Sequence, residues 1–269
     1  MPYVAKGDLS VRWPQQYRRT FILGPDHGFR TILHFECIPG RCRIEVNGRL
    51  VLIHDPGELP FDCDVTDYVR EGENSIFFEV SGLSKAEESA RVFIEEMRYQ
   101  RMSRQGYLRP IVLERRPKVS VEDVTIVTKI EPRKVLQASI VVTNASTEVR
   151  AIELIASVGD WCSELQQLSV PGGTAVRVNL SRIWPDVPLW NPETATLHFL
   201  KINLSECGKL IDSHIERFGF REVRIDGDRL LLNGYPLLVR RDTDLGYGWN
   251  SDEDVRRILL QLRNRGFWG

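Results

Sequence analysis

The alternation of apolar and polar residues around short turns constrains the fold of this chain more than any other feature. In CRIEVNGRLVLIHD (42–55), two alternating stretches flank the dipeptide Asn47-Gly48. Asn-Gly tolerates the positive φ angles of a type I′ turn, so it is the strongest short signal for a β-hairpin. RTILHFECI (30–38), PFDCDVTDYV (60–69) and NSIFFEVSG (74–82) show the same alternation. Strands at this spacing predict a sandwich of antiparallel sheets.

One stretch breaks the alternation. In KAEESARVFIEEMRYQ (85–100), Ala86, Ala90, Phe93 and Met97 recur at helical spacing. This periodicity predicts a helix or a long excursion between the strands.

A second β-rich segment opens near Val119. Gly, Pro, Asn and Ser separate its expected strands, which are VEDVTIVTKI, KVLQASIVVTNAS, VRAIELIASVGD, LQQLSV, TAVRVNL and ATLHFLKINLS. About 100 residues with some seven strands are typical of an immunoglobulin-like sandwich. The loop from Trp184 to Trp190 is rich in Trp and Pro. It can stack on a sugar ring or plug the end of the sandwich, and we favour the plug.

The third segment is short and ends on a helix. Asp226-Gly227 and Asn233-Gly234 predict two turns, and PLLVRR (236–241) is expected to form one buried strand. Ser251 caps the helix that follows, Gly266 ends it, and its apolar side carries Ile258, Leu259, Leu262 and Phe267. One strand-loop-helix unit cannot bury both faces of its strand, so it needs parallel neighbours that this chain does not supply.

Four stretches in order resemble the N-terminal part of glycoside hydrolase family 2, the β-galactosidase, β-glucuronidase and β-mannosidase group. They are VNGRLVLIHDPGELPFDCDVTDYVREGENSIFFEV, GYLRPIVLE, PLWNPETATLHFLKI and FGFREVRIDGDRLLLNGYPLLVRR. The resemblance implies a mainly β chain with a jelly-roll, galactose-binding-like domain over residues 1–118. It further implies an immunoglobulin-like sandwich over residues 119–219 and the truncated start of a (β/α)8 barrel over residues 220–269.

The resemblance also bears on catalysis. The family cleaves β-linked sugars by a retaining mechanism with two carboxylates, and its two catalytic glutamates lie on later barrel strands. We therefore expect no catalytic residue in this chain. A complete barrel needs about 250 residues, and only about 50 follow the second sandwich.

The resemblance indicates two groups of substrate-binding residues. Arg240, Asp242 and Asp244 follow the first expected barrel strand, where side chains face the active site, although an ordinary acidic loop is an equal alternative. His54 and Glu58 lie in a jelly-roll loop that approaches the barrel mouth in this family. A turn whose polar side chains bond their own backbone is the favoured alternative there.

Composition excludes several other functions. Thirty-six basic and 37 acidic residues leave a net charge of −1, which argues against nucleic acid as a partner. No apolar run reaches the about 20 residues of a membrane span, so no membrane partner is expected. The histidines and cysteines lack metal-ligand spacing, and no motif indicates a cofactor. Five cysteines favour free buried thiols and a cytoplasmic location, or a periplasmic or secreted one if a signal peptide has been removed.

Two functions from different classes remain. The chain is either the accessory part of a family 2 glycosidase, itself inactive, or a free-standing carbohydrate-binding or adhesive module. Carbohydrate is the expected partner in both cases. The apolar residues of 222–269, which lack a barrel to cover them, also predict self-association through that segment.

Overall fold

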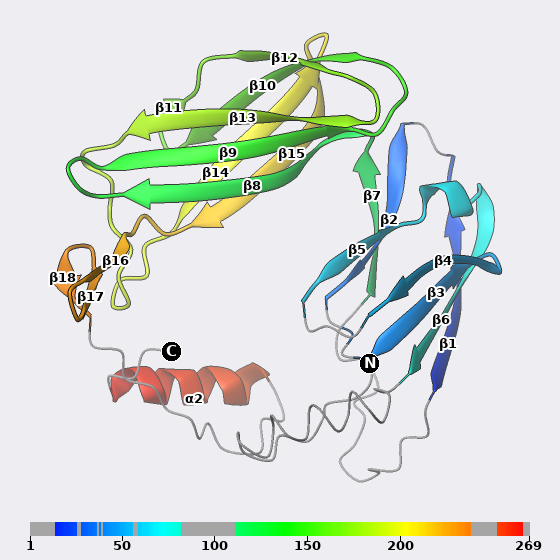
Figure 1. Cartoon of the computed structure of the whole chain (residues 1–269), viewed down its shortest axis with the longest axis horizontal. Helices are drawn as coiled ribbons and strands as arrows, with labels where there is room; N and C mark the ends of the chain where they lie inside the picture. The colour runs from blue at the N-terminus through cyan, green and yellow to red at the C-terminus, as the bar shows by residue number, and fades with distance from the viewer. Residues whose placement is uncertain are drawn as a thin grey trace. The chain divides into compact units, whose positions relative to one another are not determined.

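The computed structural model describes residues 14–25, 28–36, 38, 40–55, 59–81, 111–237 and 252–265. The chain divides into two compact units, residues 1–118 and residues 119–269 (Figure 1). Every strand pairing among the described residues is antiparallel. The prediction of a mainly β chain is therefore confirmed. The expected helix near residues 85–100 lies outside the described residues.

The first unit is a sandwich of two sheets. One sheet has the order β1 (Gln15–Leu23), β6 (Gly72–Ser81), β3 (Arg41–Val46) and β4 (Arg49–His54). The other has the order β5 (Phe61–Asp64), β2 (Phe29–Phe35) and β7 (Ile111–Pro117). Strand β1 was not predicted; its half-buried and exposed residues alternate except at Arg19, but only Tyr17, Phe21 and Leu23 of the half-buried set are apolar.

The predicted hairpin at Asn47-Gly48 is confirmed. The φ angles are +53° at Asn47 and +75° at Gly48, as a type I′ turn requires. The Asn47 side chain also fastens the turn, because it donates to the Tyr68 carbonyl at 2.8 Å and accepts from Ser75 N at 2.9 Å. Further along the chain, the expected strand over residues 60–69 ends at Asp64. A short 3-10 helix, η1 (Thr66–Tyr68), replaces its second half.

The second unit is also a sandwich of two sheets. One has the order β13 (Thr174–Ile183), β9 (Val135–Asn144) and β8 (Val119–Lys129). The other has the order β11 (Trp161–Cys162), β10 (Arg150–Val158), β14 (His198–Glu206) and β15 (Lys209–Phe218), with β12 (Gln166–Val170) also paired to β10. The six expected strands of this segment all form. Strand β15 is an addition, since the turn before it is Cys207-Gly208, an unusual pair that adopts φ angles of +50° and +74°.

A small third sheet follows the second sandwich (Figure 1, orange). It contains β16 (Val223–Asp226), β17 (Arg229–Leu232) and β18 (Tyr235–Pro236). The first turn is displaced by one residue from the expected Asp226-Gly227, because Asp226 pairs with Arg229 and leaves Gly227 and Asp228 as the loop. Most of the expected strand PLLVRR lies outside the described residues.

The predicted C-terminal helix is α2 (Asp252–Asn264). Its expected cap Ser251 and expected stop Gly266 lie outside the described residues. Ile258 and Leu262 are half-buried, whereas Leu259 is 46% exposed, so the covered side of the helix is narrower than expected. The described residues contain no parallel strand pair, and a barrel is not shown.

The cores belong to each unit separately. The first is built on Phe35, Ile38, Ile44 and Val46, and the second on Ile140, Ile152, Leu154, Leu200 and Ile202. Cys42 and Cys63 are free buried thiols, as expected, but Cys162 and Cys207 are exposed. Leu231 and Leu232 of the small sheet are only 6% and 8% exposed. The expectation that the segment from residue 222 onward is left uncovered is therefore wrong for these two leucines.

Candidate functional site

His54 is the one predicted substrate-binding residue that the structure describes. Its ring stacks on Phe61 with the centroids 3.7 Å apart, and Phe61 stacks in turn on the buried Phe35 at 4.7 Å. The buried Nε2 atom of His54 has no hydrogen-bond partner among the described residues. Burial lowers the pKa of His54, although the charge of Asp55 opposes this shift. His54 is therefore a neutral ring at pH 7 that extends the aromatic core.

Replacing His54 with Phe is expected to stabilise the first unit by up to about 1 kcal/mol, because it removes an unpaired buried nitrogen and keeps the stack. The pKa is lower in the folded than in the unfolded state, so the unfolded chain binds more protons below about pH 6.5. The wild-type protein should thus lose stability as the pH falls through that value, and His54→Phe should lose less. Urea unfolding at pH 7.5 and pH 5.5 measures both effects. Equal pH dependence in the two proteins would contradict this account of His54.

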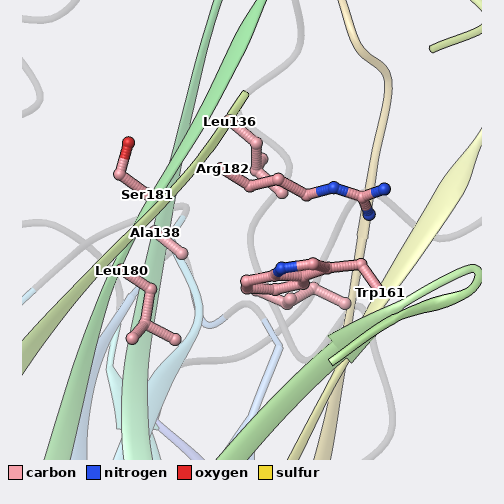
Figure 2. Close-up of a pocket in the computed structure, with 7 residues that line it drawn as sticks. Leu136, Ala138, Trp161, Leu180, Ser181 and Arg182 are labelled. Atoms are coloured by element: carbon pink, nitrogen blue, oxygen red, sulfur yellow. The ribbon is translucent and has the colours of Figure 1, made fainter. Parts of the chain in front are cut away.

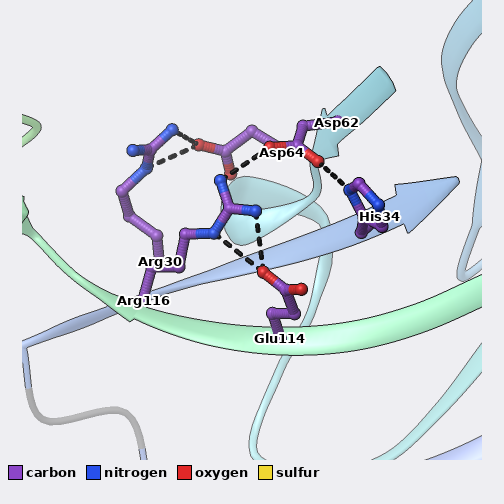
Figure 3. Close-up of polar contacts among 6 residues, drawn as sticks. All are labelled: Arg30, His34, Asp62, Asp64, Glu114 and Arg116. Carbon is purple, nitrogen blue, oxygen red and sulfur yellow. Dashed lines mark hydrogen bonds and ion pairs between the residues drawn. The ribbon is translucent and has the colours of Figure 1, made fainter. Parts of the chain in front are cut away.

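A network of charged side chains lies on one face of the sheet β5–β2–β7 (Figure 3). Arg116 Nη1 donates to Asp62 Oδ2 at 2.6 Å, and its Nη2 donates to Glu114 Oε2 at 2.7 Å. The remaining pairs are His34 Nδ1 with Asp62 Oδ1 at 2.6 Å and Arg30 Nε with Asp64 Oδ2 at 2.9 Å. We call these six residues the charged network. Ile32, which pairs in register with Asp64 and Glu114, is only 1% exposed at the network's centre.

The contacts of the charged network are suited to fastening neighbouring strands. Burial alone would raise the pKa of Asp62, but hydrogen bonds from Arg116 and His34 and their charges lower it overall. The pKa of Asp64 is lowered in the same way, by Thr66 and Arg30 against the effect of burial. Both carboxylates are therefore ionised at neutral pH. A retaining glycosidase needs one carboxylic acid that is still protonated there, and neither group meets this requirement.

The Trp-rich loop closes one end of the second sandwich. Val187 is 2% exposed, and Trp184 and Leu189 pack against the core of the unit. The Arg182 guanidinium lies 4.2 Å from the Trp184 ring centroid and 5.5 Å from that of Trp161. Figure 2 shows Arg182 extended over the Trp161 ring; the small space beside them is lined by strand residues of the sandwich and is closed to a water-sized molecule. The packing of Trp184, Val187 and Leu189 on the core supports the plug interpretation of this loop.

The other predicted site residues are not described. Glu58, Arg240, Asp242 and Asp244 lie outside the described residues. The charged network was not predicted. Its sequence signal is charge at alternate positions of two strands, Asp62 and Asp64 of β5 and Glu114 and Arg116 of β7. The residues that the structure describes contain no group of three side chains suited to a metal ion. Nor do they contain a helix long and apolar enough to cross a membrane.

These observations define a class: two antiparallel sandwiches in tandem. Comparison with protein families makes the class specific. Residues 10–117 match the family 2 glycosyl hydrolase sugar binding domain, and residues 119–221 match the domain that follows it, described as glycosyl hydrolases family 2. The chain belongs to glycoside hydrolase family 2, and it contains the N-terminal sugar-binding domain and the immunoglobulin-like domain of that family.

Solved structures show the same fold at low sequence identity. A β-galacturonidase from Eisenbergiella tayi bound to galacturonate is 20% identical, with a TM-score of 0.80 over 96% of this chain and 46% of its own. A β-glucuronidase from Bacteroides uniformis is 22% identical, with a TM-score of 0.77 over 94% of this chain and 32% of its own. A protein from Bacteroides fragilis described as a putative β-galactosidase is 20% identical, with a TM-score of 0.72 over 82% and 35%. This chain thus spans less than half the length of each.

Proposed function

We propose that this chain is the accessory N-terminal region of a family 2 glycosidase that hydrolyses O-glycosidic bonds of β-linked sugars by a retaining mechanism. The two sandwiches support and orient a catalytic domain, and the chain alone has no hydrolytic activity. Carbohydrate is the partner of the whole enzyme. The observation that carries the proposal is the match of two consecutive family 2 domains in their order along the chain.

The finer assignments belong to the same proposal. We propose that the first sandwich is a jelly roll and that residues 220–269 begin a (β/α)8 barrel. Arg240, Asp242 and Asp244 would then bind sugar hydroxyls at the mouth of that barrel, with His54 and Glu58 contributing from the first sandwich. After the second sandwich come the short strands β16, β17 and β18 and then helix α2, and this order supports the assignment. The ordinary acidic loop stays an equal alternative for the two aspartates. For His54 and Glu58 a structural role stays the favoured alternative, and the stacking of His54 on Phe61 agrees with such a role.

The alternative is a free-standing carbohydrate-binding or adhesive module, and sugar affinity distinguishes the two. If the first sandwich mainly supports a catalytic domain, its affinity for galactose, glucuronate or galacturonate should be no tighter than a Kd of about 1 mM. Titration calorimetry on the whole chain measures this value, with an unrelated β-sandwich protein as the control. A micromolar Kd for any of these sugars would favour the free-standing module.

Self-association through residues 222–269 is a further part of the proposal. Ile225 is 78% exposed and Tyr235 is 77% exposed, and both lie in the small sheet. Such side chains gain free energy when another copy covers them. We expect sedimentation velocity to show a fraction of dimer that rises with protein concentration. Ile225→Asp should lower this fraction. Ile22→Asp is the matched control, because Ile22 is 80% exposed but lies in the first unit. A monomer at all concentrations would contradict this part.

A further inference from the structure

The segment that leaves the second sandwich is bound to it at several separate points. Arg221 exchanges two hydrogen bonds with the Thr128 hydroxyl, which donates to Arg221 O at 2.5 Å and accepts from Arg221 N at 3.2 Å. Ile130 N donates to the Glu222 carboxylate at 3.2 Å. These contacts hold the segment against the end of strand β8, 92 or more positions earlier in the sequence.

The Trp-rich loop holds the same segment from a second side. Trp190 N donates to Phe220 O at 2.9 Å, and the Arg221 guanidinium lies 4.6 Å from the Trp190 ring centroid. Gly219 packs so closely that a Cβ atom there would lie 2.7 Å from the Trp190 ring. Since real side chains do not approach this closely, glycine is required at this position for Trp190 to lie so near the backbone.

Asn233 joins these contacts to the small sheet. It lies in the β17–β18 turn with a φ of +55°, which asparagine tolerates better than most residues. Its Oδ1 accepts from Glu222 N at 3.0 Å, and its Nδ2 donates to Trp190 O at 2.9 Å. Its backbone N donates to Glu222 O at 2.8 Å. One side chain thus connects the β17–β18 turn, the Trp-rich loop and the segment that leaves the second sandwich.

We infer that residues 219–237 form one rigid body with the second sandwich, and that Asn233 is the positioning residue that locks them together. This body extends beyond the sandwich's last strand and includes Leu237, whose N donates to Leu230 O at 2.7 Å. The sandwich therefore fixes the direction of the chain as far as Leu237. The inference goes beyond the proposed function, since it holds whatever follows Leu237.

Amide hydrogen exchange on the whole chain tests the inference. In the wild-type protein, the amides of Asn233, Leu237 and Trp190 should be as protected as the hydrogen-bonded amides of β14 and β15. Asn233→Gly keeps the positive φ angle accessible but removes both side-chain hydrogen bonds, so residues 223–237 should exchange at least about tenfold faster. The core strands β9, β10 and β14 should be unchanged.

Two further variants make the result specific. Cys207→Gly is the matched control, because Cys207 also occupies a two-residue turn with a positive φ, +50°, in the same unit. It should leave the exchange of residues 223–237 unaltered. Asn233→Asp keeps the acceptor for Glu222 N and loses the donor to Trp190 O, so its effect should be intermediate. Rapid exchange of residues 223–237 in the wild type, or no acceleration in Asn233→Gly, would overturn the inference.

Discussion

Replacing Phe35 with Ala should lower the free energy of unfolding of the first unit by about 3–5 kcal/mol. Phe35 is fully buried, with an exposed fraction of 0%, and its ring stacks on Phe61 at an interplanar angle of 2°. Removing the ring leaves a cavity beside Phe61. The variant loses the free energy gained by burying the apolar ring, and it also loses the packing contacts of the side chains around the cavity. Most small domains have a total stability of about 5–15 kcal/mol, so the variant should be close to unfolding.

Urea unfolding followed by circular dichroism measures this effect, provided that the two units are resolved as separate transitions. Phe29→Ala is the matched control, because Phe29 lies on the same strand but is 37% exposed and contacts the Arg115 guanidinium across its ring. The control should cost less than about 1 kcal/mol. A loss in Phe35→Ala no larger than in Phe29→Ala would show that the Phe35–Phe61–His54 stack is not the centre of this core.

The strands of the sandwiches were largely predictable from the sequence, because burial on one face forces a period of two. Strand β9 shows this well: Leu136, Ala138, Ile140 and Val142 are all buried, and the residues between them are more exposed. The Asn-Gly turns were predictable for a separate reason, since few residue pairs adopt two positive φ angles. Where local sequence alone sets the backbone, the prediction succeeded.

Predictions failed where a distant contact decides the local structure. Strand β15 follows a Cys-Gly turn, and its inward-facing residues include the polar Asp212, whose carboxylate accepts from Val121 N at 2.8 Å. No pattern of neighbouring residues announces such a pairing. The small sheet is likewise held by a distant contact, because Asn233 in its second turn donates to Trp190 O.

The candidate site was the least predictable part. His54 was selected from a family resemblance, and its position against Phe61 depends on the packing of β4 over β5. The charged network brings together residues from three strands, and only the register of β2 with β5 and β7 aligns them. Alternate charges in a strand usually indicate a solvated face, so sequence alone gave no reason to group Arg30, Asp62 and Arg116.

The chain contains the sugar-binding and immunoglobulin-like domains of family 2, and the central proposal is that it has no hydrolytic activity on its own. Hydrolysis of nitrophenyl β-galactoside, β-glucuronide, β-galacturonide and β-mannoside by the purified chain tests it most directly. Enzymes commonly turn over about 1–1000 times per second, so even weak activity is readily detected. The account predicts no release of nitrophenol above that of buffer, at any pH at which the chain is folded. Turnover that is abolished by a single substitution in this chain, such as Asp242→Asn or Asp62→Asn, would contradict it.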